Sequence, residues 1–280
     1  MSGLSIGAYP IVFAPTGMLP TKSQTAFVPI TPKEIGEQVE RCAKIGITSV
    51  HVHARDPEGN PDWKIETYKA IVSEIKTRNQ DVLINVSTSG RSWTEIEKRA
   101  DCLALEGDLK PELASLTLSS LNFLSGPAIN APETIYKLAE IMKTRGITPE
   151  LEIFDLGMVN MISVLSKKGL LDFPLVANLF FGNIAGVQAT PSEIGLMVDR
   201  LPDKTIWSGA GIGRFRDQVH AISLASGGGV RVGLEDGIYL NDDKKVLATN
   251  EQLVERVHRM ASFLGREYMK PAEFRFLISA

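Results

Sequence analysis

Cysteine is scarce in this chain: its 280 residues include two, Cys42 and Cys102, both inside segments of helical periodicity. Two cysteines without a partner spacing exclude a disulfide framework and a cysteine-rich zinc site, and they suit a reducing compartment. No stretch reaches the roughly 18–20 uninterrupted apolar residues of a membrane-spanning helix. The first residues also lack a basic region followed by an apolar core, so we predict no export signal and a cytoplasmic location.

A charge excess is also absent, because 30 basic residues face 33 acidic ones and the formal net charge is −3. Without a basic surplus we expect no nucleic-acid partner, and without runs of like charge we expect no charged tail. Hydrophobic residues make up 44% of the chain, which favours a globular protein whose partner is a small molecule. The length allows one α/β unit, and we predict a single domain over residues 1–280.

Histidine is the other rare residue, yet two of the four histidines lie two positions apart. In the segment 49–56 valine and histidine alternate, so in a strand His51 and His53 project to one face and the valines to the other. Two imidazoles side by side on a rigid strand are half of a metal site. The alternative is a pair of hydrogen-bonded polar residues at a strand end. His220 and His258 lie in helical patterns, and we expect both to be structural.

Eight short apolar segments recur along the chain, and a helical pattern follows each of them. The apolar segments span residues 10–15, 49–56, 82–88, 113–118, 149–154, 175–181, 204–208 and 230–234. The helical patterns span 32–45, 63–76, 132–145, 158–170, 216–226 and 250–264, and two more begin at caps in 92–95 and 190–193. Apolar strands that alternate with helices predict a parallel sheet covered by helices. With eight units and no linker, a (β/α)8 TIM barrel is favoured over a doubly wound open sheet.

Polar residues gather where these apolar strands end, which is where the catalytic groups of a barrel lie. They are Thr16, Gly17, His51, His53, Arg55, Asn85, Ser87, Ser89, Thr117, Ser119, Asn122, Glu150, Glu152, Asp155, Asn183, Arg231, Glu235 and Asp236. Among them Glu235 is the expected third metal ligand, because it matches Arg231 in strand parity. Two histidines and one carboxylate leave an open coordination position, which is typical of catalytic zinc and also suits iron(II). A helix cap or an ion pair is the alternative role for Glu235 and for Asp155.

Glycines cluster in the run Gly209-Ala210-Gly211-Ile212-Gly213-Arg214. Their spacing fails the dinucleotide-binding fingerprint, so a nicotinamide oxidoreductase has only this run in its favour. Barrel loops after the seventh and eighth strands often bind phosphate through backbone N–H groups. A coenzyme A thioester is therefore a candidate ligand of this run, together with Arg214.

Several motifs occur in an order that covers nearly the whole chain. They are Ala14-Pro15-Thr16-Gly17, Thr31-Pro32 with Glu34, His51-Val52-His53-Ala54-Arg55-Asp56, Asn85-Val86-Ser87-Thr88, Pro149-Glu150, Ala210-Gly211-Ile212-Gly213-Arg214, Gly228-Gly229 and Arg231-Val232-Gly233-Leu234-Glu235-Asp236. In this order the chain resembles the β-keto acid cleavage enzymes. The resemblance implies a zinc-dependent TIM barrel, usually a homotetramer, that condenses a β-keto acid with acetyl-CoA and gives acetoacetate and a new acyl-CoA.

Residue by residue, the resemblance makes His51, His53 and Glu235 the zinc ligands. It makes Arg231 and Asp236 the pair that takes a proton from the substrate, and we expect Arg231 to keep the Asp236 carboxylate ionised. The substrate-binding candidates are Ser87, which matches a substrate-binding serine of the family, and three strand-end residues, Thr16, Gly17 and Thr117.

One position departs from the family members that cleave 3-keto-5-aminohexanoate. Those members carry a glutamate two residues after the glycine that matches Gly17, and it holds the amino group of the substrate. This chain has Leu19 at that position. An apolar side chain cannot pair with an ammonium group, whose burial without a partner is costly. We therefore expect a neutral or apolar β-keto acid rather than 5-amino-3-oxohexanoate.

Two further classes of function remain open at this stage. A metal-dependent hydrolase of the amidohydrolase type also carries H-x-H in a barrel, but on the first strand and with further histidines on strands five and six. The predicted fifth and sixth strands of this chain contain no histidine. A barrel that binds a ligand without catalysis is disfavoured by the complete set of metal ligands.

Overall fold

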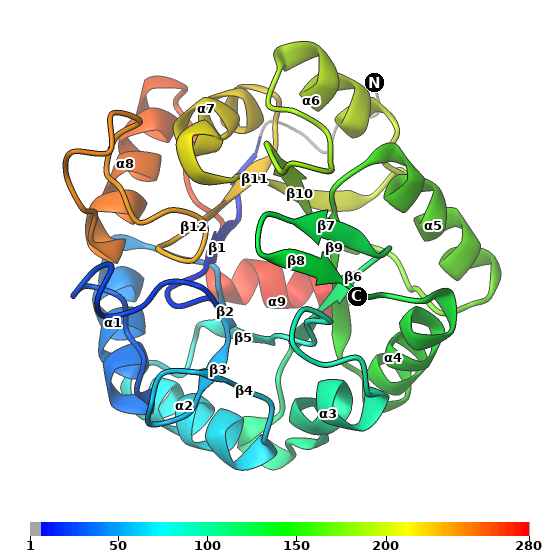
Figure 1. Ribbon diagram of the computed structural model, residues 1–280. Helices are drawn as coiled ribbons and strands as arrows, with labels where there is room; N and C mark the ends of the chain where they lie inside the picture. The colour runs from blue at the N-terminus through cyan, green and yellow to red at the C-terminus, as the bar shows by residue number, and fades with distance from the viewer. Residues whose placement is uncertain (1–6, 280) are drawn as a thin grey trace.

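Eight parallel strands close into a barrel in the computed structural model, which describes residues 7–279 (Figure 1). They are β1 (Ile11–Phe13), β2 (Ser49–Val52), β5 (Leu83–Val86), β6 (Leu113–Thr117), β9 (Thr148–Ile153), β10 (Leu175–Phe181), β11 (Thr205–Gly211) and β12 (Gly229–Val232). Each strand pairs with the next in this series, and β12 pairs with β1 to complete the ring. The predicted (β/α)8 TIM barrel is confirmed.

An outer ring of helices surrounds the strands (Figure 1). They are α1 (Pro32–Ile45), α2 (Ile65–Arg78), α3 (Ile96–Ala100), α4 (Pro132–Arg145), α5 (Leu156–Lys167), α6 (Pro191–Asp199), α7 (Arg216–Ala225) and α8 (Asn250–Phe263). Thr31 begins α1 with a capping box. The apolar stripe of α1, which includes Ile35 and Val39, is fully buried in the core. Thr190 caps α6 as predicted. No helix in residues 7–279 is both long and apolar enough to cross a membrane.

The predicted helix cap in residues 92–95 is confirmed only in its position, because its last residue takes the N-cap place without a side-chain capping bond. The helix here, α3, begins only at Ile96, and it continues as a 3-10 turn over Asp101–Ala104. Glu95 occupies the N-cap position without a side-chain capping bond. Its carboxylate pairs with Lys98 at 2.7 Å instead, so the group that would have completed a capping box is already engaged.

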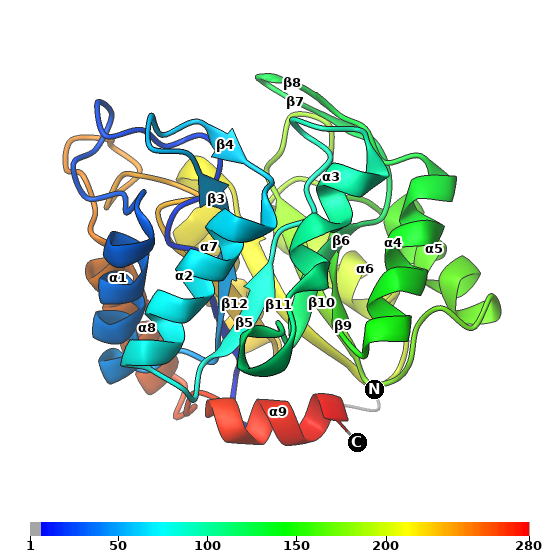
Figure 2. The same ribbon diagram turned by 90° about the horizontal axis from the view of Figure 1, so that it is seen from below.

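Five barrel strands are shorter than the sequence pattern predicts, namely β1, β2, β5, β6 and β12, and two hairpins extend the same end of the barrel (Figure 2). The histidine strand β2 stops at Val52, after which β3 (Ala54–Arg55) pairs with β4 (Pro61–Asp62). After β6, the strands β7 (Leu121–Phe123) and β8 (Gly126–Ala128) form a second hairpin. The last barrel strand ends at Val232, which leaves Glu235 in the turn that follows.

A ninth helix, α9 (Pro271–Ser279), covers the opposite end of the barrel (Figure 2). Its Phe274 is 1% exposed and packs with residues at the beginnings of four barrel strands. These are Leu83, Leu113, Val176 and Ile206. The segment before the helix is also tied to the start of the chain, because Tyr9 exchanges backbone hydrogen bonds with residues 267 and 269. One end of the barrel is therefore sealed, and a ligand reaches the strands from the other end.

We predict that Phe274→Ala lowers the free energy of unfolding by about 3–5 kcal/mol, because it leaves a cavity where α9 meets the strands. Chemical denaturation measures this change. Phe276→Ala on the same helix is the matched control, since Phe276 is 73% exposed and its loss should change stability by no more than about 0.5 kcal/mol. Equal effects of the two substitutions would show that α9 does not seal the barrel.

Candidate metal centre and active site

The two histidines of the alternating segment lie together inside the barrel. Their Nε2 atoms are 3.1 Å apart, and the rings meet edge to face with centroids 4.9 Å apart. Both side chains are buried. Val50 and Val52, on the other face, are buried in the surrounding hydrophobic core. The predicted alternation of faces in this strand is therefore confirmed.

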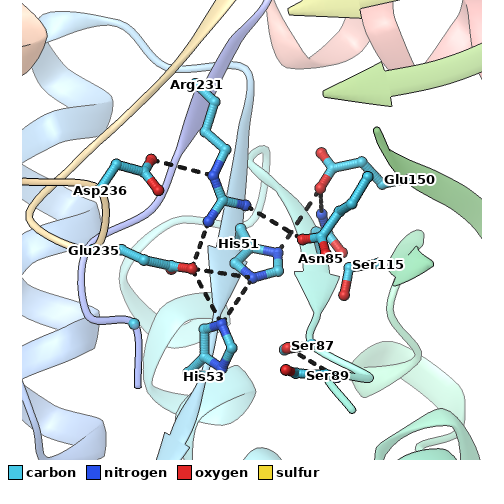
Figure 3. Close-up of polar contacts among 12 residues, drawn as sticks. His51, His53, Asn85, Ser87, Ser89, Ser115, Glu150, Arg231, Glu235 and Asp236 are labelled. Atoms are coloured by element: carbon cyan, nitrogen blue, oxygen red, sulfur yellow. Dashed lines mark hydrogen bonds and ion pairs between the residues drawn. The ribbon is translucent and has the colours of Figure 1, made fainter. Parts of the chain in front are cut away.

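Glu235 reaches both histidines from the turn after β12 (Figure 3). Its Oε1 atom lies 3.2 Å from Nε2 of His53 and 3.9 Å from Nε2 of His51. Neighbouring ligand atoms of a tetrahedral zinc ion lie roughly 3.3 Å apart, given bond lengths near 2.1 Å. The three donor atoms therefore fit around one cation. The second carboxylate oxygen of Glu235 is buried and has no hydrogen-bond partner among the described residues, so it too is available to an ion.

Two glycines make room for Glu235 where the first and last strands meet. A Cβ atom on Gly233 would lie 1.9 Å from the carbonyl oxygen of Ala14, and one on Gly17 would lie 2.5 Å from Cγ of Glu235. Gly17 also has a φ of +64°, which favours glycine. Thr16, next to it, is fully buried. Thr16 and Gly17 thus lie behind Glu235 and not on the pocket wall, and their role in substrate binding stays a prediction.

Burial and charge give two of the three candidate ligands, Glu235 and His51, suitable protonation states. Burial would raise the pKa of Glu235, but the Arg231 guanidinium, helped by the two histidines, holds that pKa well below its usual range. Burial, and then the positive charge of Arg231, lowers the pKa of His51 well below its usual range. An ionised carboxylate and a neutral imidazole are the forms that bind a metal ion.

Arg231, on β12, connects the acidic groups of the site. From its fully buried guanidinium, Nη2 donates to Oε1 of Glu235 at 2.5 Å and Nε donates to Oδ2 of Asp236 at 3.2 Å (Figure 3). Its Nη1 atom lies 3.8 Å from Oε1 of Glu152. Burial works against the charged form, yet these carboxylates raise the pKa of Arg231 above its usual range. Arg231 is therefore a permanent cation in contact with three acids.

Asp236 is easier to protonate than the sequence suggests. Burial raises the pKa of its carboxyl group to about 6, and Arg231 lowers it by less than burial raises it. Arg231 lowers this pKa, as expected, but desolvation outweighs the single ion pair, so the carboxyl group ionises closer to neutrality than an ordinary aspartate does. A carboxyl group with this pKa is still mostly ionised above pH 7, and it is close enough to neutrality to act as a base and then release its proton.

A pocket of about 260 Å³ opens at this end of the barrel. Its polar wall consists of His53, Ser87, Ser89, Arg91, Thr117, Glu152, Arg231, Glu235 and Asp236. Its apolar wall includes Met18, Leu19, Leu121, Phe123, Phe154, Phe180 and Ile212. The structure thus places the predicted substrate-binding residues Ser87 and Thr117 on this wall. Thr117 donates from Oγ1 to Oε2 of Glu152 at 2.6 Å, which fixes the orientation of both side chains.

Sequence reasoning missed the part of the pocket formed by Arg91 and the β7–β8 hairpin. The guanidinium carbon of Arg91 lies 3.7 Å from the centre of the Phe123 ring. Burial lowers the pKa of Arg91, and nearby carboxylates, first among them that of Glu235, act in the opposite direction. The only available signals were the turn pair Ser125-Gly126 between two apolar residues and the position of Arg91 just after a polar strand end.

Other candidates have structural contacts. Asp155 caps α5 and does not reach the pocket, which matches the alternative role considered for it. His220 donates from Nε2 to the carbonyl oxygen of Arg231 at 2.8 Å, and His258 donates to that of Gly46 at 2.9 Å. Both histidines are structural, as expected. His220 also stabilises the strand position from which Arg231 projects.

The glycine run has a packing explanation. Cβ atoms on Gly209 and Gly211 would lie 1.9 and 2.5 Å from atoms of α7, so these glycines let that helix lie directly against β11. Gly213 has a φ of +60°, and its N–H group donates to the carbonyl oxygen of Asp236 at 2.9 Å. Arg214 is exposed. The run therefore supports the turn that carries Asp236, and its contact with a coenzyme A thioester stays a prediction.

Comparison with known proteins assigns the chain to a family. Residues 9–279 match the family model of the beta-keto acid cleavage enzymes. The 3-keto-5-aminohexanoate cleavage enzyme of Fusobacterium nucleatum is 34% identical, over 92% of this chain and 93% of its own. The 3-oxoadipate:acetyl-CoA acetyltransferase of Cupriavidus necator is 33% identical, over 96% and 93%. The 3-dehydrocarnitine:acetyl-CoA trimethylamine transferase of Rhizobium meliloti is 31% identical, over 95% and 94%.

A solved structure agrees at the level of the fold. The apo structure of ObcA superposes with a TM-score of 0.80 and 23% identity, over 90% of this chain and 65% of that longer one. The family model, which spans nearly all of the described residues, and relatives that are more than 30% identical point to the same assignment. This chain belongs to the β-keto acid cleavage enzyme family.

Proposed function

We propose that this protein is a zinc-dependent enzyme that condenses a β-keto acid with acetyl-CoA and releases acetoacetate and a new acyl-CoA. The observation that carries the proposal is the meeting of His51, His53 and Glu235 beside the Arg231–Asp236 pair, at the open end of the barrel. Relatives that are named for acetyl-CoA-dependent reactions of different β-keto acids support it.

Zinc is the metal that we propose for the three ligands. Two imidazoles and one carboxylate are a common set for catalytic zinc, and they leave a position open for substrate. When bound, the ion would act as a Lewis acid on the carbonyl group of the keto acid. Iron(II) uses the same donor set, so metal analysis is part of the test.

Asp236 is the proposed base. Its carboxylate would take a proton from the carbon between the two carbonyl groups of the keto acid, and Arg231, 3.2 Å away, would keep it oriented. The resulting carbanion attacks the thioester carbon of acetyl-CoA. The thiolate of coenzyme A moves to the original acyl group, and the bond between that group and the former α-carbon breaks. The protonated Asp236 then returns its proton to the α-carbon, which gives acetoacetate and restores the base, so that the acyl group and the acetyl group have exchanged partners.

The side chain of the substrate would extend along the apolar wall of the pocket. Leu19 lies on this wall where aminohexanoate-cleaving relatives are expected to carry a glutamate. Arg91 lies in the same pocket, and a second cation disfavours a substrate that carries an ammonium group. Leu19 supports a neutral or apolar β-keto acid, and Arg91 argues only against a cationic one.

The family resemblance also implies a homotetramer, which we retain as a proposal. Light scattering coupled to size-exclusion chromatography measures the assembly directly.

We predict that the purified protein contains near-stoichiometric zinc. Removal of the metal with a chelator should abolish acetoacetate formation, and added zinc should restore it, because the keto acid loses its Lewis acid. His51→Ala should lose both metal and activity, whereas His258→Gln on the distant helix α8 should keep both. Full activity of the metal-free protein would rule out the proposed chemistry.

Asp236→Asn should lower kcat by roughly 10²–10⁴-fold while metal content stays unchanged, because the amide cannot accept the proton. In the unsubstituted enzyme, kcat should fall as the pH drops through about 6, since the carboxyl group then becomes protonated. Steady-state kinetics between pH 5 and 8 checks both expectations. A variant that retains normal kcat would show that another group is the base.

Leu19→Glu should raise kcat/KM for 5-amino-3-oxohexanoate and lower it for 3-oxohexanoate, because a carboxylate now faces the substrate's side chain. Leu19→Gln controls for polarity without charge and should not favour the amino substrate. A panel that also contains 3-oxoadipate tests the preference of the unsubstituted enzyme. If the ammonium-bearing acid were its best substrate, the assignment based on Leu19 would be wrong.

A further inference from the structure

One buried carboxylate near the metal centre has no part in the chemistry above. Glu150, on β9, is completely inaccessible to solvent. Its Oε2 atom lies 3.8 Å from Nδ1 of His51 and accepts a short hydrogen bond from Nδ2 of Asn85 (Figure 3). Its other oxygen, Oε1, has no hydrogen-bond partner among residues 7–279. Burying a carboxylate is costly when one of its two oxygens accepts no hydrogen bond, so the position of Glu150 calls for a reason.

Arg231 supplies only part of that reason, because its positive charge lowers the pKa of Glu150 against the larger effect of burial. Arg231 directs its hydrogen bonds to Glu235 and Asp236, and its third nitrogen, Nη1, lies next to Glu152. Glu150 is therefore not a direct hydrogen-bond partner of the guanidinium. The imidazole of His51 is the ionisable side chain in closest contact with Glu150.

The Nδ1 atom of His51, on the side of the ring near Glu150, lacks a hydrogen-bond partner among the described residues. Its Nε2 atom faces His53 and Glu235, while its Nδ1 atom is buried without a hydrogen bond within the described chain. A neutral imidazole carries one proton, and a ring whose Nε2 lone pair binds a cation must carry that proton on Nδ1. A donor in this position requires an acceptor. Glu150 Oε2 and the unpartnered Oδ1 atom of Asn85 are the acceptors at hand.

The strand register holds these groups together. His51 and Asn85 are direct neighbours across β2 and β5, and Asn85 spans the barrel interior to Glu150. All three side chains are less than 2% exposed, so water does not compete for their hydrogen bonds. Because the three come from different strands, their meeting is a property of the closed barrel.

We propose that Glu150, anchored by Asn85, is a positioning residue for the metal. Its carboxylate accepts the proton of His51 Nδ1, and this fixes Nε2 toward the cation. The inference rests on the metal site proposed above. Outer carboxylates of this kind orient a histidine ligand and increase its basicity, and their loss typically weakens metal affinity by roughly 10- to 100-fold.

The test compares Glu150→Gln with Glu152→Gln, which removes a carboxylate of the same size two residues along the same strand. Glu152 contacts Thr117 and Arg231 and no histidine, so the second variant controls for lost negative charge near the metal. Competition with a chromophoric chelator gives the dissociation constant for zinc alone. The absorption spectrum of the cobalt-substituted protein reports the ligand geometry, and the melting temperature of the metal-free protein reports stability.

We expect Glu150→Gln to weaken zinc affinity roughly 10- to 100-fold and to alter the cobalt spectrum, with little change in the melting temperature without metal. Glu152→Gln should change the affinity clearly less. If Glu150→Gln does not fold, Asn85→Ala removes the anchor and carries the same expectation. Affinity within threefold of the unsubstituted protein, or equal losses in the two glutamine variants, would overturn the proposal. If the unsubstituted protein binds no metal, the proposed function fails instead.

Discussion

A single buried guanidinium is the constraint on which this site depends. Arg231 is in contact with Glu152, Glu235 and Asp236, so one positive charge faces three negative ones in a region that water barely reaches. Burying unbalanced charge costs several kcal/mol for each ion. A divalent cation between Glu235 and the two histidines would correct most of this imbalance. The acidic side chains and the candidate metal site thus belong to one electrostatic arrangement. Neither Arg231 nor a metal ion alone would neutralise its negative charge.

The same arrangement divides the acids by role. Glu235 accepts the shorter hydrogen bond from Arg231 and faces two imidazoles, so its pKa falls and it remains available as a ligand. Asp236 has the longer bond and a less exposed side chain, so its pKa rises to about 6. Two adjacent carboxylates therefore differ in basicity because their surroundings differ. This difference supports the proposed roles, in which Glu235 holds a cation while Asp236 exchanges a proton.

Much of this site could be predicted because it depends on periodicity. The alternation of valine and histidine fixed the common face of His51 and His53, and eight apolar segments implied a ring in which the last strand meets the first. Together the two patterns predicted that Glu235 lies near the histidines. The barrel itself followed from the alternation of apolar strands with helical segments. The alternation of side chains along a strand and the succession of strands and helices can both be read from the sequence.

What could not be predicted depends on burial and on contacts between distant segments. The adjacency of Arg231 and Asp236 suggested an ion pair, but desolvation, which decides the pKa of Asp236, appears only when the surrounding walls are present. Helix α9 was missed because its 9 residues are too few for a clear helical period. Its partners are the beginnings of four strands distant in sequence. The β7–β8 hairpin has strands of three residues, too short for a periodic signal.

The division between rigid and variable parts explains how one family can serve different substrates. The groups proposed for the chemistry lie on barrel strands, directly after β2 in the case of His53, or in the turn that Gly17 and Gly233 allow against β1. The residues expected to meet the substrate's side chain, such as Leu19 and Phe123, lie on a loop and a hairpin, and both are at least partly exposed. Loop residues change without disturbing the barrel core. Relatives at 31–34% identity that are named for different β-keto acids are what this division would produce, because cleavage and selection of the side chain are encoded in separate segments.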